Sequence, residues 1–148
     1  MKRIAVLCGV LVVATTTGCM TKRSAEFEAG VDLNSYESFH VVRSLIVRQG
    51  AERGNVGELI QADLARRGKK ATFGKKSEAP QGAQIIVTFD DTWYRDITLY
   101  LLELKVNFSD ATTGRRLGTG SSLRTSLSRK EPAVMVSEIL DRCFPAGQ

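Results

Sequence analysis

The arrangement of apolar and polar residues divides the chain into an apolar leader, a polar stretch and a patterned segment. An uninterrupted apolar run covers residues 4–14, and a polar, irregular sequence covers 20–34. From residue 36 onward, apolar positions recur with the period of two or of three to four that is typical of strands and helices. We therefore expect one folded domain over residues 35–145, preceded by a tether over 19–34.

Four segments of the domain have the composition and alternation expected of β-strands. The first is rich in β-branched and aromatic residues, and the others mainly place apolar residues at every second position. In the last segment, Gly118 and Gly120 predict a bulge or the close approach of another backbone. The predicted strands cover residues 36–47, 85–93, 100–108 and 115–126, and the turn-forming sequence 109–114 separates the last two.

Two further segments carry apolar residues at helical spacing. The first helix should begin after Asn55, with Glu58 at the spacing of a capping box, and should end at Gly68. The second should begin at Pro132, because proline suits the first turn of a helix. Its apolar stripe is expected to face a sheet and consists of Val136, Ile139, Leu140 and Cys143.

Together these elements predict an α+β fold, a two-layer sandwich with the order β-α-β-β-β-α. Helices and strands with one apolar face have to bury that face against a second layer. We expect a four-stranded, mostly antiparallel sheet with both helices on one face, in which the last three strands form a meander. The first strand should pair with one of these after the helix has crossed the sheet.

The first 19 residues have the organisation of a secretory signal. Lys2 and Arg3 precede the apolar run, small residues follow it, and Cys19 comes directly after Gly18. The run is about half as long as the roughly 20 apolar residues that span a bilayer, which argues against a transmembrane helix. The arrangement resembles the lipobox of bacterial lipoproteins, although Thr16 stands where Leu or Val is usual.

The lipobox resemblance implies that the chain is cut before Cys19 and that the thiol of this residue carries diacylglycerol. Residues 1–18 would then be a signal peptide, and the acyl chains would hold the mature protein stably at a membrane. Met20 is not the Asp that retains such lipoproteins at the inner membrane. The resemblance therefore implies the outer membrane of a Gram-negative bacterium, facing the periplasm. An ordinary cleaved signal is the alternative.

Charge and cysteine content narrow the function only slightly. Residues 1–18 contain two of the 21 basic residues, so without them the formal net charge falls from +5 to +3. So small an excess does not indicate binding to nucleic acid. Cys8 lies in the signal and Cys19 is the expected lipid site, which leaves Cys143 as a thiol that we expect to be buried and structural.

The order of elements behind a lipobox resembles the small α+β lipoproteins of Gram-negative envelopes. Residues 109–114, SDATTG, after a leucine-rich strand carry the local resemblance. Over residues 36–144 the architecture is similar to that of the lipopolysaccharide-assembly lipoprotein and of the N-terminal domain of the Tol-system β-propeller protein. The resemblance implies a two-layer domain and brings no catalytic residues with it.

The end of the second predicted strand gathers the side chains that are candidates for chemistry or binding. Asp90 and Asp91 are adjacent, so they should point to opposite faces, which disfavours a shared acid–base role together with Asp96. Trp and Tyr are enriched at interface hot spots. The candidates for partner binding are therefore the neighbouring residues Trp93, Tyr94 and Arg95. The alternative is that Trp93 continues the buried side of its strand.

The remaining sequence supplies little material for catalysis. His40 is the only histidine, and we expect it to be half exposed on its strand, without a catalytic or metal-binding role. We expect a non-enzymatic, lipid-anchored accessory or scaffold protein of envelope assembly or transport, without a cofactor or metal and with an envelope protein as its partner. A module that binds a glycan, lipid or small molecule is the alternative. A hydrolase that uses Asp91 or Asp96 is a third hypothesis.

Overall fold

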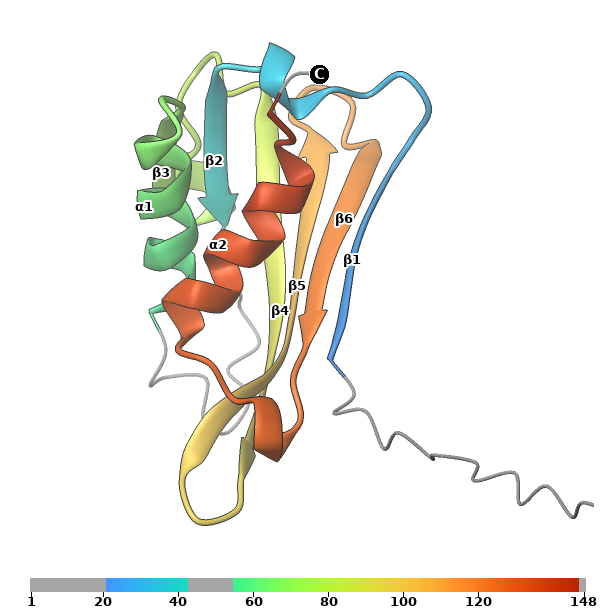
Figure 1. Ribbon diagram of the computed structural model, residues 1–148. Helices are drawn as coiled ribbons and strands as arrows, with labels where there is room; N and C mark the ends of the chain where they lie inside the picture. The colour runs from blue at the N-terminus through green and yellow to red at the C-terminus, as the bar shows by residue number, and fades with distance from the viewer. Residues whose placement is uncertain (1–20, 43–54, 147–148) are drawn as a thin grey trace, which may run out of the picture.

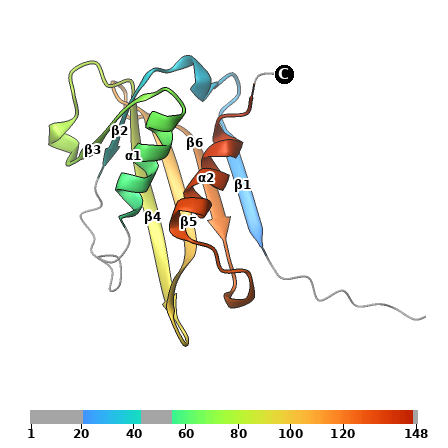
Figure 2. The same cartoon turned by 60° about the vertical axis from the view of Figure 1, so that its left-hand side comes forward.

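The computed structural model describes residues 21–42 and 55–146, which form a six-stranded sheet with two helices on one face (Figures 1 and 2). The strands are β1 (Lys22–Phe27), β2 (Ser38–Val42), β3 (Lys70–Gly74), β4 (Ile85–Arg95), β5 (Leu99–Asp110) and β6 (Arg116–Leu123). The helices are α1 (Val56–Arg66) and α2 (Pro132–Cys143), with short 3-10 turns at η1 (Leu33–Ser35), η3 (Lys76–Glu78) and η4 (Ser126–Ser128). No helix within these two ranges is long and apolar enough to cross a membrane.

The strands lie side by side in the order β1-β6-β5-β4-β2-β3. β4, β5 and β6 are antiparallel neighbours, which confirms the predicted meander, and β1 pairs antiparallel with β6 at one edge. β2 runs parallel to both β4 and β3. Parallel neighbours require crossover connections, and these are provided by the segment with α1 between β2 and β3 and by residues 75–84 between β3 and β4.

The predicted α+β class is confirmed, but the four-stranded, mostly antiparallel sheet is wrong because two strands were missed. β1 lies inside the stretch 20–34 that the sequence pattern predicts to be irregular, and it turns only Ala25 and Phe27 toward the core. β3 has five residues and follows α1 closely, between Lys69 and Lys75. Such short, polar edge strands show little alternation, and their pairing partners decide their conformation.

The predicted helices have nearly the observed extents, but the expected capping box is absent from the first. The side chain of Asn55 makes no capping hydrogen bond, whereas its carbonyl accepts from the N–H of Leu59 at 2.9 Å. Gly68 ends α1 with φ +81°, a left-handed conformation that glycine adopts without strain. α2 begins at Pro132 as predicted. Residues 43–47 of the first predicted strand lie outside the described residues.

The hydrophobic core lies between the helices and the facing side of the sheet. The stripe of α1 buries Val56, Ile60 and Leu64, and that of α2 buries Met135, Val136, Ile139, Leu140 and Cys143. Opposite them, alternate residues of the central strands are buried, namely Phe39, Val41, Ile85, Val87, Leu104, Val106 and Phe108. Full burial of one such side chain stabilises the fold by about 1.5–3 kcal/mol.

Two glycines of β6 let neighbouring side chains approach the sheet closely. A Cβ on Gly118 would overlap the ring of Phe27. A Cβ on Gly120 would lie 2.6 Å from Sγ of Cys143 and 2.7 Å from Cγ2 of Ile139. The predicted bulge is present, because the register of β5 and β6 shifts between Phe108 and Ser109, which pair with Gly118 and Arg116. The predicted approach of another backbone is not what the glycines accommodate, because side chains of β1 and α2 lie nearest to them.

His40 is buried, which corrects the expectation of a half-exposed side chain. It lies on the sheet face away from the helices, in register with Thr72 of β3. Its Nδ1 lies 2.7 Å from Oγ1 of Thr72, and its Nε2 donates to the carbonyl of Lys75 at 2.9 Å. Both ring nitrogens are thus bound by β3 and by the start of the crossover that follows it.

Candidate functional site

The long hairpin of β4 and β5 places the predicted partner-binding residues at one end of the molecule (Figure 1). Trp93 is half-buried against the core, and its indole N–H donates to the carboxylate of Asp91 at 2.6 Å. Tyr94 is 53% exposed and meets the ring of Tyr100 edge-on, with 5.9 Å between centroids. Arg95 is exposed. Only Tyr94 and Arg95 are therefore freely available to a partner.

The segment around η4 packs against the tip of this hairpin. The guanidinium group of Arg129 lies 4.4 Å from the ring centroid of Tyr100, donates to the hydroxyl of Thr98 at 2.7 Å and pairs with Asp96. Desolvation alone would raise the pKa of Asp96, but hydrogen bonds from the N–H groups of Ile97 and Thr98 and from Arg129 hold it below its ordinary value. These contacts hold the two segments in one arrangement.

The beginning of the described chain is tied to the same place. Arg124, which is 4% exposed, contacts the carboxylate of Glu138 and donates to Oγ1 of Thr21 at 3.4 Å. Lys130 donates to Glu138 at 2.5 Å, and Arg23 lies 3.6 Å from the same carboxylate. We refer to the segments that meet here as the hairpin end of the domain: residues 21–23, 94–98 and 124–131.

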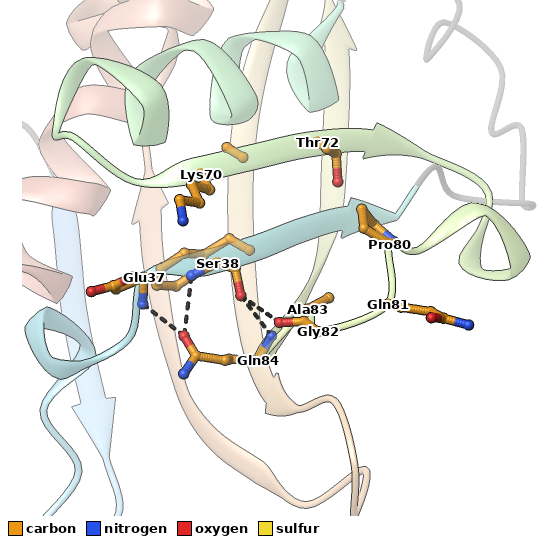
Figure 3. A pocket seen from close by; sticks show the side chains of 11 residues that line it. Glu37, Ser38, Lys70, Thr72, Pro80, Gln81, Gly82, Ala83 and Gln84 are labelled. Atoms are coloured by element: carbon orange, nitrogen blue, oxygen red, sulfur yellow. Dashed lines mark hydrogen bonds between the residues drawn. The ribbon is translucent and has the colours of Figure 1, made fainter.

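A pocket of about 490 Å³ opens at the opposite end of the sheet, where β2, β3 and β4 begin (Figure 3). The side-chain oxygen of Gln84 accepts from the backbone N–H groups of Glu37 at 2.8 Å and Ser38 at 3.2 Å. The hydroxyl of Ser38 donates to the carbonyl of Gly82 at 2.8 Å. These hydrogen bonds hold the wall formed by residues 80–84 against the start of β2.

The groups that remain available to a ligand in this pocket are polar. Lys70 is exposed on β3, and its ammonium group has no hydrogen-bond or ion-pair partner within the described residues. The lining also includes the side chains of Glu37 and Gln81 (Figure 3). Ammonium, carboxylate and amide groups around an open pocket suit a polar ligand such as a sugar or a small anion.

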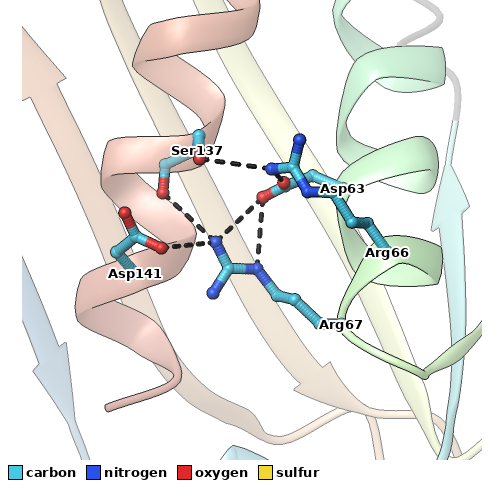
Figure 4. A network of polar contacts seen from close by, with 5 residues as sticks. All are labelled: Asp63, Arg66, Arg67, Ser137 and Asp141. Atoms are coloured by element: carbon cyan, nitrogen blue, oxygen red, sulfur yellow. Dashed lines mark hydrogen bonds and ion pairs between the residues drawn. The ribbon is translucent and has the colours of Figure 1, made fainter. Parts of the chain in front are cut away.

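A polar network joins α1 to α2 on the helical side of the molecule (Figure 4). Asp63 is 5% exposed and pairs with both Arg66 and Arg67. Arg67 also lies 2.7 Å from the carboxylate of Asp141, and Arg66 donates to the hydroxyl of Ser137 at 3.3 Å. Because two guanidinium groups face two carboxylates, the network neutralises itself and serves to hold the helices together.

The other residues that the sequence singles out do not converge on a reactive site. Cys19 lies outside the described residues. Cys143 is buried as predicted, and burial raises the pKa of its thiol to about 12, so the thiol is protonated and unreactive at neutral pH. Asp90 and Asp91 occupy successive positions of β4 and so face opposite sides of the sheet. Within residues 21–42 and 55–146, no three His, Cys, Asp or Glu side chains are placed to hold a metal ion.

The sequence pattern missed the pocket but did contain a signal for the hairpin end. Glu37, Lys70 and Gln84 are distant in sequence and meet only because β2 runs parallel to both of its neighbours. No local motif marks such residues. Ile97 and Leu127, in contrast, are single large apolar residues within polar turns, and they are 95% and 85% exposed. Ile97 belongs to no predicted strand or helix, and such an isolated apolar residue is the signal. Alternation instead places Leu127 on the apolar side of the strand predicted over 115–126, which is wrong because β6 ends at Leu123 and Leu127 lies in η4.

The fold defines the chain as a two-layer α+β domain, with helices on one side of a mixed sheet. Neither a protein-family model nor a curated protein matches the sequence. The structure is similar to PelC from Paraburkholderia phytofirmans, which was solved as a dodecamer. A single-substitution variant of PelC has a TM-score of 0.66 and 15% identity, covering 84% of this chain and 98% of that chain.

Two further solved structures are similar in fold and low in sequence identity. PelC in a second crystal form has a TM-score of 0.63 and 13% identity, covering 87% of this chain and 100% of that chain. A PDZ domain protein from Parabacteroides distasonis has a TM-score of 0.51 and 13% identity, covering 88% of this chain and 36% of that chain. At these identities the similarity establishes the fold alone.

Proposed function

We propose that this protein is a lipid-anchored lipoprotein of the outer membrane of a Gram-negative bacterium. It faces the periplasm and acts as a non-enzymatic accessory or scaffold in envelope assembly or transport. The observation that carries this proposal is Cys19, which ends an apolar leader and lies just before a folded domain. Several acyl chains on that residue give stable attachment, whereas a single chain gives only marginal attachment.

The structure alters the expected distance between the anchor and the domain. A flexible tether over residues 19–34 would have given the domain a reach of about 50 Å, at roughly 3.3 Å per residue. β1 begins at Lys22, and Thr21 directly before it is the first described residue. Only two peptide steps separate Cys19 from Thr21, and these span at most about 7 Å. The proposed anchor therefore holds the domain directly at the membrane surface.

A Cys19→Ala variant tests the anchor. Wild-type protein should fractionate with membranes and carry the added mass of acyl chains at the mature N-terminus. Cys19→Ala should be soluble or remain unprocessed, because the acceptor thiol is missing. Cys143→Ala is the matched control and should fractionate like the wild type, because its thiol is buried. A mature wild-type protein that carries no added acyl mass would contradict the anchor.

The scaffold role is supported by the capacity of this fold to assemble. PelC, which shares the fold, was solved as a dodecamer. In the described part of this chain, β1 and β3 are the outer strands of an open sheet, and outer strands offer unpaired backbone groups to a neighbour. We propose that copies of this chain associate through such surfaces. Native mass spectrometry of the full-length protein extracted in mild detergent should show oligomers, and a strictly monomeric protein would contradict self-assembly.

The pocket supports a second candidate function, which is binding of an envelope glycan or another small polar ligand. Lys70→Ala removes the ammonium group from the lining, whereas Lys76→Ala is a control on an exposed lysine outside it. We expect isothermal titration with lipopolysaccharide or peptidoglycan fragments to show binding that Lys70→Ala weakens and Lys76→Ala preserves. Equal affinity in the two variants would exclude this pocket as the site.

A further inference from the structure

Four large hydrophobic side chains are exposed among the described residues, and all lie in or beside the hairpin end. Their exposed fractions are 95% for Ile97, 85% for Leu127, 53% for Tyr94 and 42% for Val134. Val134 belongs to the first turn of α2, which starts at this end of the molecule (Figures 1 and 2). Scattered exposed hydrophobic residues are ordinary, but a cluster of them marks an interaction surface.

The two most exposed of these side chains project from ordered turns. The carboxylate of Asp96 accepts from the N–H groups of Ile97 at 2.5 Å and Thr98 at 3.3 Å, which shapes the hairpin tip. Leu127 lies in η4, where the N–H of Ser128 bonds to the carbonyl of Thr125 at 3.0 Å. Arg129 connects the two turns, so Ile97 and Leu127 are presented together.

The charge of the hairpin end suits an anionic surface. Residues 21–23, 94–98 and 124–131 contain six Lys or Arg and two Asp or Glu, and Glu138 of α2, which contacts three of these basic residues, lowers the excess to three positive charges. Arg95 is exposed two residues before Ile97, and Lys22 is exposed at the start of β1, level with Leu123 and Glu103. Apolar side chains flanked by basic residues are the composition of segments that lie in the interface of an anionic membrane.

The position of the anchor identifies the surface that the hairpin end meets. The chain enters the domain here, because Thr21 is bound by Arg124 and Lys22 pairs with Leu123 at the end of β6. A lipid on Cys19 would insert within about 7 Å of Thr21. The bilayer that holds the anchor is therefore the nearest apolar phase to Ile97 and Leu127.

We propose that the hairpin end is a second membrane contact, in which Ile97 and Leu127 enter the anchored leaflet while Arg95 and Lys22 meet anionic lipid headgroups. This inference rests on the proposed lipid anchor. The second contact fixes the domain upright and prevents it from rotating about a single acylated residue.

Fluorescent labels on introduced cysteines test this contact in the full-length, natively processed protein. Ile97→Cys and Leu127→Cys carry the label at the hairpin end, and Thr112→Cys carries it in the exposed turn between β5 and β6 at the opposite end. Native thiols do not interfere, because Cys8 leaves with the signal, acylation blocks Cys19 and Cys143 is buried. The labelled proteins are reconstituted into vesicles of phosphatidylethanolamine and phosphatidylglycerol, with or without doxyl-labelled lipid.

We expect blue-shifted emission from the nitrobenzoxadiazole label at positions 97 and 127, with strong quenching by doxyl lipid, and neither effect at 112. Emission at 97 and 127 equal to that at 112, with Cys19 acylated, would overturn the contact. A blue shift without doxyl quenching would assign the surface to a contact between copies of this chain and also overturn it.

The mass of the mature protein shows whether Cys19 is acylated. It therefore distinguishes a failure of the membrane contact from a failure of the proposed anchor. If Cys19 proves unacylated, the proposed function fails, and vesicles are then added to the processed protein, with Cys19→Ser as background. A vesicle-induced blue shift at 97 would still support the membrane contact, and no shift would overturn it. In that background Ile97→Asp should weaken vesicle binding by about tenfold or more, as expected for one buried aliphatic side chain, while Thr112→Asp should not.

Discussion

At Gly120 the absence of a side chain sets the distance between α2 and the sheet. Sγ of Cys143 and Cγ2 of Ile139 occupy the space that a Cβ would need. Cys143 packs there as a small apolar residue, and the same burial raises the pKa of its thiol to about 12. The packing of this cysteine and its lack of reactivity therefore have one cause.

Gly120→Ala should destabilise the protein by about 1–3 kcal/mol, because the new methyl group forces α2 away from β6. Urea unfolding measures the free energy. The matched background is Cys143→Ala, which removes the nearest atom, so the cost of Gly120→Ala should be smaller there. An equal cost in both backgrounds would show that the Sγ contact does not limit the helix position.

Glu138 is expected to make the stability depend on pH. Desolvation alone would raise its pKa, but hydrogen bonds from Lys130 and Arg124 and the charges of both lower it. A carboxylate with a depressed folded-state pKa contributes stability that is fully present above the unfolded pKa, about 4.3, and is lost as the pH falls through the folded pKa. The free energy of unfolding should therefore fall less steeply below about pH 5 in Glu138→Gln than in the wild type. Urea titrations across this range measure the slope, and identical slopes would contradict the prediction.

At the scale of elements, the helices are determined by their own sequence, whereas the edge strands are determined by their neighbours. α1 and α2 follow from their own apolar stripes, and their ends follow from Gly68 and Pro132. β1 and β3 owe their conformation to the strands beside them. Asp63 is buried in α1 and pairs with Arg66 and Arg67, the two arginines that reach Ser137 and Asp141 of α2.

Asp63→Asn should destabilise the protein by about 1.5–3 kcal/mol, because it leaves the guanidinium of Arg67 without its buried charged partner. Asp141→Asn is the matched control in the same network, and it should cost about 0.5 kcal/mol because this carboxylate is largely exposed. Thermal and urea unfolding measure both. A larger loss for Asp141→Asn than for Asp63→Asn would show that the network acts mainly at its surface.

At the scale of the whole molecule, the sheet separates two surfaces. β4 begins at the pocket and ends at the hairpin end, and its 11 residues extend about 36 Å at roughly 3.3 Å each. A domain anchored at its hairpin end therefore opens its pocket away from the membrane, toward the periplasm. A ligand in the pocket and lipid at the hairpin end would not compete.

Energy transfer to acceptor lipids checks this orientation. A donor on Thr112→Cys should lie about 40 Å from the bilayer surface, because the 12 residues of β5 separate it from the hairpin tip. A donor on Ile97→Cys should transfer almost completely. Similar efficiencies at the two positions would mean that the sheet lies flat on the membrane.

The fold was predictable where a segment's own pattern is strong. The meander of β4, β5 and β6, both helices and the burial of Cys143 follow from periodicity, turn residues and apolar content. His40, β3 and the pocket did not follow, because they depend on parallel crossovers that bring distant residues together. β1 did not follow, because it pairs with β6 about a hundred positions away. The partner-binding hypothesis for Trp93, Tyr94 and Arg95 stays a prediction, and the structure adds that Trp93 is partly committed to the core.

The sequence by itself determined the class of the domain, its helices and central strands, and the expected lipid site at Cys19, because these features are local and periodic. Only the tertiary structure decided where the chain enters the domain, because the pairing of β1 with β6 depends on a partner about a hundred positions away. That pairing ties Thr21 and Lys22 to the end of β6, whereas the parallel pairing of β2 with β3 and β4 forms the pocket at the opposite end of the sheet. Long-range strand pairing thus makes residues 22–27, which the sequence pattern assigns to a tether, the edge strand of the sheet.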